Sequence, residues 1–337
     1  MKLISAFTVA LSLLLGACGA PGEMLFVRHL NADLPILVQG QVASKKMLVF
    51  IHGGPGGTGV TRYGSAAFQA LGQHFAVASY DQRMAGLAQG NPASDTLTLE
   101  QHVDDLDLVI EVLRQRYPGA KLYLLGHSWG GAVATAYLAN PVRQAKITAW
   151  MPTDAAYDMG SSLRQSREWV IGRAQARLAQ GMDAAIAQEA LIWYGQTPVL
   201  TGSALVRHFT YLAKLGAYIH HPAAADKPNV GQLLFFGPYS VGSEALNLTQ
   251  TFQHQSLDRL ATLNLSDRLP AITLPSLVMS GRYDGSVPMA ASEVLYEALG
   301  TRTQDKTLTI FDNSAHRPMD DEPQAFVAAV KAFMDRY

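Results

Sequence analysis

Short apolar runs that alternate with longer amphipathic stretches are the feature that most limits how this 337-residue chain can fold. The run MLVFIH (47–52) has no polar alternation, which is typical of a strand buried on both faces of a sheet. The stretch 98–116 instead carries apolar residues at helical spacing, and Thr98 and Gln101 can cap its first turn. Strands that alternate with helices form a mostly parallel sheet with helices on both faces. The sequence therefore predicts an α/β fold.

Eight segments are predicted to be strands of one sheet: 24–29, 34–40, 47–52, 75–80, 121–126, 146–151, 275–281 and 307–311. Asn31, Ala32 and Asp33 are predicted to form the turn between the first two. The alternation stops near residue 152 and resumes near residue 272, with helical patterns between. We therefore expect a helical cap, 152–271, inserted between two parts of the core, 18–151 and 272–337. The second part should end in a helix from about Pro323 to Arg336.

The first twenty residues have the pattern of a secretory signal, with Lys2 followed by an apolar run that is too short to span a bilayer. The only cysteine, Cys18, directly follows Leu15-Gly16-Ala17. That order resembles the lipobox of bacterial lipoproteins; the alternative is an ordinary cleaved signal with an incidental thiol. The resemblance implies removal of residues 1–17 and a lipid on Cys18. It also implies an extracytoplasmic protein held at a membrane, with the outer membrane favoured by Gly19.

Composition limits the partners of the folded part. Hydrophobic residues make up 48% of the chain and charged residues 16%, which predicts a large core rather than disorder. The formal net charge is −1 and the basic residues form no run, so nucleic acid is not expected as a partner. Membrane contact is expected through the lipid alone. In the stretch 98–116, we expect the four acidic residues off the apolar face to be solvated: Asp104, Asp105, Asp107 and Glu111.

The segment GHSWGG (126–131) lies between a predicted strand and a predicted helix. A nucleophile elbow is such a strand–turn–helix, in which a strained serine needs small neighbours to keep strand and helix from colliding. Gly126, Gly130 and Gly131 meet that demand. The alternative is that Ser128 is only a small residue at a tight turn. The setting favours Ser128 as a nucleophile.

A serine hydroxyl becomes a good nucleophile when a histidine takes its proton and a carboxylate orients that histidine. With an elbow of this kind, the acid and then the histidine follow the serine along the chain. Asp284 lies in the loop after the predicted strand 275–281, and His316 lies in the loop after 307–311. We therefore predict Ser128, Asp284 and His316 as the catalytic residues. The nearby Asp320 or Asp321 is predicted instead to cap the final helix.

Acyl transfer also needs N–H groups that bind the developing oxyanion. We expect one from the backbone of Trp129, the residue after the serine. The other should come from the glycine-rich loop HGGPGG (52–57), with Gly54 as the donor and Gly53 as the alternative. Further along, Asp81 and Arg83 are expected to brace the loop beside the site.

Three segments, HGGPGG, YDQR (80–83) and GHSWGG, together resemble the proline iminopeptidase group of the α/β-hydrolase fold. The resemblance implies hydrolysis of an amide or ester through an acyl-enzyme, without a metal or an organic cofactor. The chain departs from the group's pattern at Met84, Ala88 and His127. An aminopeptidase also needs a buried anion for the substrate's ammonium group. Nothing in the sequence selects one among the candidates of the cap: Asp158, Glu168, Glu189, Glu244 and Asp258.

The sequence thus predicts a serine hydrolase that acts on a small molecule or short peptide. An aminopeptidase like proline iminopeptidase leads, and a carboxylesterase acting on small esters is the alternative. A further alternative is a non-catalytic binding lipoprotein built on a hydrolase fold. A buried acid in the pocket between cap and core would favour the peptidase, and an apolar pocket would favour the esterase.

Overall fold

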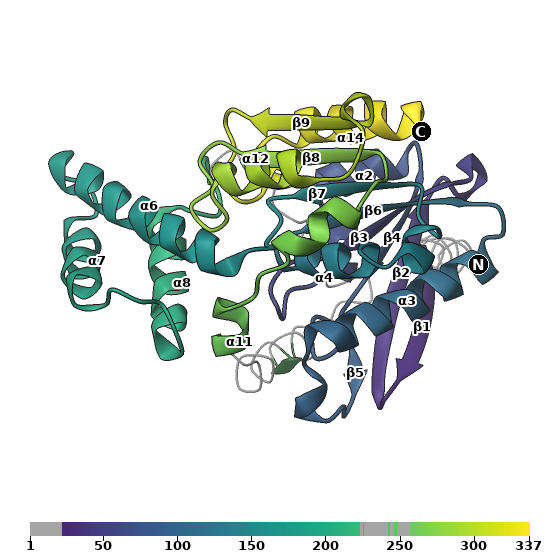
Figure 1. The fold of residues 1–337 in the computed structure, drawn as a ribbon, viewed down its shortest axis with the longest axis horizontal. Helices are drawn as coiled ribbons and strands as arrows, with labels where there is room; N and C mark the ends of the chain where they lie inside the picture. Colours follow the sequence, from purple (N-terminus) through teal and green to yellow (C-terminus); the bar gives the residue numbers. More distant parts are fainter. Residues whose placement is uncertain (1–21, 223–224, 226–241, 243–245, 248–256) are drawn as a thin grey trace, which may run out of the picture.

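In a computed structural model, the described residues are 22–222, 225, 242, 246, 247 and 257–337 (Figure 1). The predicted signal segment, Cys18 and Glu244 lie outside them. A single sheet forms the centre of the molecule (Figure 1). Its strands are β1 (Glu23–His29), β2 (Ala32–Gly40), β3 (Lys46–Ile51), β4 (Ala76–Tyr80), β5 (Gln89–Gly90), β6 (Lys121–His127), β7 (Ala149–Thr153), β8 (Ser276–Gly281) and β9 (Lys306–Phe311).

The strand order is β1-β2-β4-β3-β6-β7-β8-β9, and the short β5 pairs with β2. Strands β1, β2 and β5 run antiparallel to their neighbours, whereas β4, β3, β6, β7, β8 and β9 are parallel to one another. The predicted mostly parallel, eight-stranded sheet is therefore confirmed, with the two-residue β5 as an addition.

The predicted turn of the first hairpin and both predicted ends of the strand 146–151 are wrong. The first hairpin turns at Leu30 and Asn31, because Ala32 already pairs with His29. Both turn residues have positive φ, 47° and 61°, as a two-residue hairpin loop requires. Strand β7 begins at Ala149 rather than at residue 146, since the chain is still turning there: Ile147 N donates to the Gln144 carbonyl.

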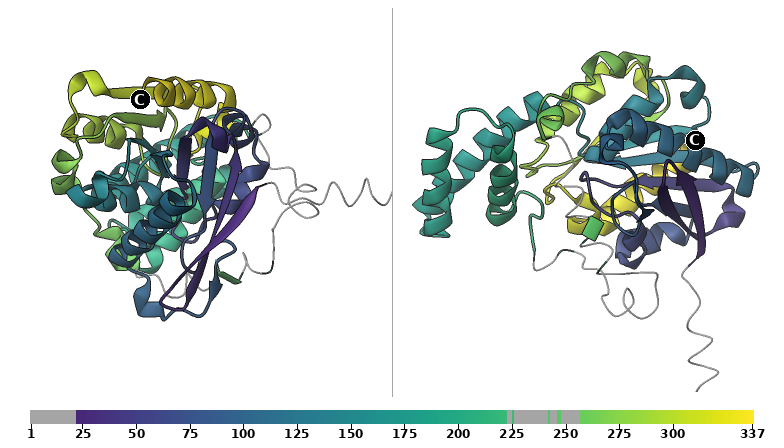
Figure 2. Two further views of the ribbon diagram at one scale, coloured as in Figure 1. Left: turned by 90° about the vertical axis from the view of Figure 1, so that its right-hand side faces the viewer. Right: turned by 90° about the horizontal axis from the view of Figure 1, so that it is seen from below.

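Strand β3 shows why both faces of the sheet are covered. Its side chains alternate, so that Met47, Val49 and Ile51 enter one buried cluster, while Leu48 and Phe50 enter another. The first cluster includes residues of helices α3 (Leu99–Arg116) and α4 (Trp129–Leu138). The second includes residues of α2 (Ala66–Gly72) and α14 (Pro323–Arg336). Helices therefore pack on both faces of the sheet, as predicted (Figure 2).

The helix predicted over 98–116 is α3, and the Thr98 side chain accepts a hydrogen bond from Gln101 N at 3.1 Å. The remaining helical elements of the core and its connections are α5 (Pro141–Gln144), α11 (Leu257–Ala261), α12 (Met289–Ala298), α13 (Pro318–Asp321), and the short 3₁₀ turns η1 (Val42–Ser44), η2 (Val60–Gly64), η3 (Ser94–Thr96), η4 (Ser266–Ala271) and η5 (Thr303–Asp305).

One acidic residue of α3 is not solvated, contrary to the prediction. Asp105 is buried and forms a two-pronged ion pair with Arg83, with Nε–Oδ2 and Nη2–Oδ1 distances of 2.6 Å each. A carboxylate can be buried there because a fixed guanidinium satisfies both oxygens. Asp81 binds the backbone N–H groups of Gly59, Val60 and Leu87. Asp81 thus holds the loop at residues 59–60 against the loop at residue 87, and Arg83 ties its own loop to α3 through Asp105.

Helices α6 (Met159–Ala179), α7 (Ala184–Gln196) and α8 (Ser203–Leu215) lie between β7 and β8 in the sequence. They form an arm that projects from one side of the sheet (Figures 1 and 2). The division of the chain at residues 152 and 271 stays a prediction. In the described part of the chain, every helix is too short or too polar to cross a lipid bilayer.

A buried polar chain connects this arm to the core. Tyr194 of α7 donates to His208 Nδ1 at 2.5 Å, and His208 Nε2 contacts Ser166 Oγ at 3.0 Å. Ser166 in turn donates to the carbonyl of Gly285, which follows β8. Burial lowers the pKa of His208 to about 4, so the ring is neutral at pH 7. A neutral ring offers one donor and one acceptor, which is what the two neighbouring hydroxyls need.

Candidate active site

Four polar residues follow four neighbouring strands of the sheet. Ser128 follows β6, Asp154 follows β7, Asp284 lies in the loop after β8, and His316 lies in the loop after β9. These strands are parallel, so their carboxyl ends meet at one edge. Binding sites of open α/β sheets lie at this edge.

The elbow at Ser128 has the strained backbone expected of it. Ser128 has φ 54° and ψ −119°, values that a non-glycine residue takes only when its surroundings enforce them. Its N–H donates to Thr153 O at 3.1 Å, and its carbonyl accepts from Gly131 N and Ala156 N at 2.8 and 3.0 Å. Backbone contacts on both sides therefore hold the turn.

His316 and Asp284 form a buried hydrogen-bonded pair. His316 Nδ1 donates to Asp284 Oδ2 at 2.7 Å, while Asp284 Oδ1 accepts from the N–H groups of Ser286 and Val287 at 2.7 and 3.0 Å. Burial lowers the pKa of His316, so the ring is neutral at pH 7. With the proton on Nδ1, the lone pair of Nε2 is free to accept another proton.

His127, where the chain departs from the proline iminopeptidase pattern, contacts the predicted base directly. Its Nε2 donates to the carbonyl of His316 at 2.8 Å, and the two ring centroids are 4.9 Å apart. Burial lowers the pKa of His127 well below its usual value, so that ring is also neutral. His127 therefore fixes the backbone that carries His316.

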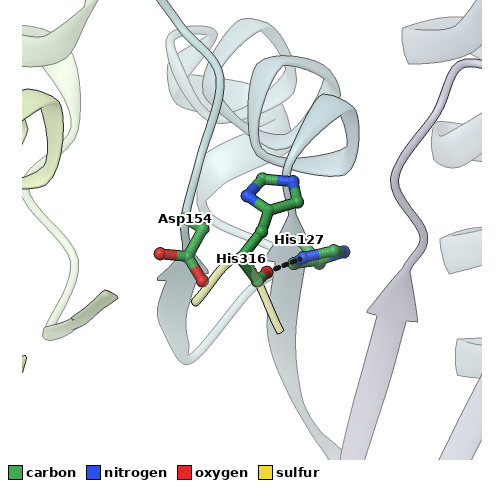
Figure 3. Close-up of side chains that lie close together, drawn as sticks. All are labelled: His127, Asp154 and His316. Carbon is green, nitrogen blue, oxygen red and sulfur yellow. Dashed lines mark hydrogen bonds between the residues drawn. The ribbon is translucent and has the colours of Figure 1, made fainter. Parts of the chain in front are cut away.

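Asp154 is a site residue that the sequence analysis missed. It is buried directly after β7, beside His316 (Figure 3). It also satisfies the chain order of serine, acid and histidine. The sequence feature that could have identified Asp154 is its place directly after an apolar strand. The strand was predicted to end at residue 151, whereas β7 extends to Thr153. Asp154 was thereby assigned to the cap.

The loop HGGPGG lies against the elbow. A Cβ on Gly53 would be 3.0 Å from Ser128 Cβ, so the two backbones approach closely. Gly54 has φ +135°, which L side chains rarely adopt. A side-chain relay joins the loop to α4, since Gln82 bonds both the His52 carbonyl, at 2.8 Å, and the Trp129 indole N–H, at 3.0 Å. The assignment of the Gly54 and Trp129 N–H groups to the oxyanion stays a prediction.

A cavity of about 350 Å³ opens above these residues. Ser128 and His316 both line it, together with the glycine-rich loop. The cap and its connections contribute apolar groups: Phe209, Tyr218, Leu257 and Leu260. Two cations, Arg62 and Arg317, complete the wall, and its described part includes no carboxylate.

Four candidate acids of the cap lie away from the cavity, where they bind other groups or face solvent. Asp158 caps α6 through Ser161 N, at 3.0 Å, and Asp258 binds Gly202 N at 2.9 Å. Glu189 pairs with Arg207 at 3.0 Å, and Glu168 is exposed. None of these four lines the cavity described above.

The predicted capping role of Asp320 or Asp321 is wrong. Glu322 occupies the N-cap position of α14, and no side chain caps that helix. Asp320 instead pairs with Arg62 Nη1 at 2.7 Å, and Asp321 accepts from Ala315 N at 2.9 Å. These contacts engage both carboxylates, and neither binds an N–H group at the start of α14.

Among the described residues, one group of side chains has the geometry to hold a metal ion. His127, Asp154 and His316 place one ligand atom each within 4.8 Å of one another. All three already have partners, since His127 Nε2 binds the His316 carbonyl, His316 Nδ1 binds Asp284, and Asp154 Oδ1 accepts from Ser280 and Gly281. The expectation that the reaction uses neither a metal nor a cofactor stays a prediction.

The sheet order and the elbow agree with the comparison to protein families, in which a model of the α/β hydrolase fold matches residues 46–323. The chain belongs to the α/β hydrolase fold family. The predicted fold class is thus confirmed for this hydrolase.

Within this family, the hydrolase is similar to proteins named as aminopeptidases and proline iminopeptidases. The hydrolase is 26% identical to "Probable aminopeptidase YbaC" of Bacillus subtilis (strain 168), covering 88% of this chain and 91% of the relative. It is 22% identical to the proline iminopeptidase of Saccharolobus solfataricus, covering 87% and 86%. The crystal structure of proline iminopeptidase from Mycobacterium smegmatis shares its fold, with a TM-score of 0.60 at 18% identity over 93% of this chain and 98% of that one. These relatives support the predicted resemblance to the proline iminopeptidase group.

The elbow generates a prediction about Gly130. A Cβ there would lie 2.1 Å from Ile51 O, a backbone atom that cannot move without shifting β3. Gly130→Ala should destabilise the hydrolase by about 1–3 kcal/mol and lower its activity at least tenfold, because the turn must open. Urea unfolding and turnover of an aryl ester measure both effects.

Gly172→Ala is the matched control, because Gly172 lies within α6 with nothing within 4 Å of the added Cβ. This change should leave activity unchanged and stabilise the fold by about 0.5–1 kcal/mol. Equal effects of the two substitutions would contradict the close packing at the elbow.

Proposed function

We propose that this hydrolase cleaves a small amide or ester through an acyl-enzyme formed on Ser128. The observation that carries the proposal is the shared cavity, in which the strained Ser128 faces the same space as the Asp284-bound His316. A nucleophile and a neutral base that face one cavity, with a buried acid hydrogen-bonded to the base, suit acyl transfer.

The geometry suggests the order of events. His316 Nε2 accepts the proton of Ser128 while Oγ attacks the carbonyl carbon, and Asp284 stabilises the imidazolium. The N–H groups of Trp129 and Gly54 donate hydrogen bonds to the oxyanion. His316 then gives its proton to the leaving group, and water repeats the attack on the acyl carbon. The serine hydroxyl is restored when the acid product leaves.

Aminopeptidase activity, the release of an N-terminal residue from a peptide or amide, is the leading candidate. The supporting observations are HGGPGG and YDQR beside the elbow, and relatives named aminopeptidase or proline iminopeptidase that match over most of their length. Such an activity also requires an anion for the ammonium group, and of the cap's candidate acids only Glu244 lies outside the described residues.

A small-ester hydrolase is the second candidate, and the cavity wall favours it. Its described lining combines apolar side chains with Arg62 and Arg317, without a carboxylate to bind an ammonium group. An ester that is neutral or carries a negative charge would meet no unpaired acid there.

The nucleophile is tested by Ser128→Ala. Because the acyl-enzyme forms on this oxygen, kcat/KM for aminoacyl aryl-amides and aryl esters should fall more than about a thousandfold. Labelling by a fluorophosphonate probe should disappear as well. Ser286→Ala is the control, since Ser286 lines the same cavity but does not lie in the nucleophile elbow. Its backbone N–H, which binds Asp284, is kept in this variant. Hydrolysis that survives Ser128→Ala would refute the mechanism.

The substrate class is tested by blocking the amine. An aminopeptidase should cleave an alanyl or prolyl aryl-amide and lose at least about a hundredfold in kcat/KM when the same compound is N-acetylated, because a buried ion pair is lost. Indifference to acetylation, together with efficient cleavage of the matching aryl ester, would establish the esterase instead.

We also propose that the hydrolase is a lipoprotein anchored outside the cytoplasm through Cys18. The supporting observation is the lipobox-like LGAC at residues 15–18, which holds the chain's only cysteine. Cys18→Ser should move the protein from the membrane pellet to the soluble fraction of a bacterial host and abolish incorporation of labelled palmitate. An unchanged distribution and unchanged labelling would contradict the anchor.

A further inference from the structure

Asp154 is a buried carboxyl group to which the proposed mechanism gives no task. It is fully buried, and its φ of 45° is strained for an aspartate. Its Oδ1 accepts hydrogen bonds from Ser280 Oγ and Gly281 N, both at 3.0 Å. Among the described residues, no group donates a hydrogen bond to its Oδ2. An oxygen buried without a donor is costly if the carboxyl group is charged.

The groups that face Asp154 make a charge there still less favourable. His316 and His127 each place a ring nitrogen within 4.8 Å of one of its oxygens. Asp154 and His127 lie on opposite sides of the stretch that carries His316 (Figure 3). Both rings are neutral at pH 7, as described above. Burial, followed by the negative charge of Asp284, raises the pKa of Asp154 well above its usual value. Two buried carboxyl groups that repel each other in this way favour sharing one proton over both being ionised.

The donors decide which of the two carries the proton. Asp284 receives three hydrogen bonds from other residues, from Ser286 N, Val287 N and His316 Nδ1, and these reach both of its oxygens. Asp154 receives two, and both end on Oδ1. The negative charge is more stable on the carboxylate with more donors. A single shared proton is therefore more stable on Asp154 Oδ2, the oxygen that lacks a donor.

We propose that Asp154 is a neutral carboxylic acid that donates its Oδ2 proton to the Asp284 carboxylate and thereby positions the Asp284–His316 pair. A side-chain hydrogen bond from Asp154 is among the interactions that oppose the burial-raised pKa of Asp284. Asp154 is a positioning residue, since it acts through Asp284. Its effect on the rate rests on the proposed function, whereas its protonation state does not.

The proposed arrangement keeps the local charge small throughout the reaction. The two carboxyl groups share one negative charge while His316 is neutral, and that charge balances the imidazolium once His316 has taken the serine proton. An ionised Asp154 would add a second, unbalanced negative charge in the same buried space.

Asp154→Asn reproduces the proposed state, because an amide also offers one acceptor and one donor in the same shape. The oxygen can accept from Ser280 and Gly281, and the NH₂ group can donate to Asp284. Asp154→Val removes both functions. Asp312→Asn is the matched control, since Asp312 is an exposed aspartate paired with Arg282.

Infrared difference spectroscopy at pH 7 tests the protonation state. The wild-type minus Asp154→Asn spectrum should contain the C=O band of one protonated carboxylic acid, and the wild-type minus Asp312→Asn spectrum should lack it. Only a carboxylate signal in the first spectrum would overturn the proposal. Ser128→Ala should retain the band, so that this result stands even if Ser128 proves not to be the nucleophile.

Steady-state kinetics test the positioning role. Asp154→Asn should keep kcat within a few-fold of the wild type, whereas Asp154→Val should lower kcat at least tenfold with little change in KM. Thermal unfolding of both variants identifies any loss that comes from misfolding. If Asp154→Val fails to fold, Asp154→Asn still decides, because a loss of kcat beyond tenfold in this folded variant would overturn the positioning role.

Discussion

The close approach of α4 to the end of β3 is the contact on which the rest of the site depends. Gly130 lies so near Ile51 that only a residue without a side chain fits between them. This closeness places Ser128 at the edge of the sheet with its strained backbone, and it brings the loop after β3 against the serine. The elbow and the glycine-rich loop, which both line the cavity, are therefore positioned by one backbone contact.

Periodicity was enough to predict most of the core. Strand β3 reads as a buried run because its alternate residues enter two different clusters, and α3 reads as a helix because one face is apolar. Ser128, Asp284 and His316 could be found because each follows a predicted strand, and the structure brings His316 and Asp284 into direct contact.

The wrong predictions have physical causes that the neighbouring sequence does not reveal. Asp154 was missed because β7 extends to Thr153, through Pro152, a residue that usually ends a strand. Asp105 was assigned to the surface because its partner, Arg83, comes from a loop 22 residues away. The specificity of the cap could not be predicted either, since it depends on which side chains meet across helices joined by irregular connections.

The buried chain from Tyr194 through His208 and Ser166 has a consequence for how the cap can move. It ends on the carbonyl of Gly285, the residue next to Asp284, and the Trp169 ring leaves no room for a side chain there. A rotation of the helical arm would pull on the peptide that holds the acid. Because Asp284 holds the His316 ring through Nδ1, such a movement would also shift that ring at the wall of the cavity.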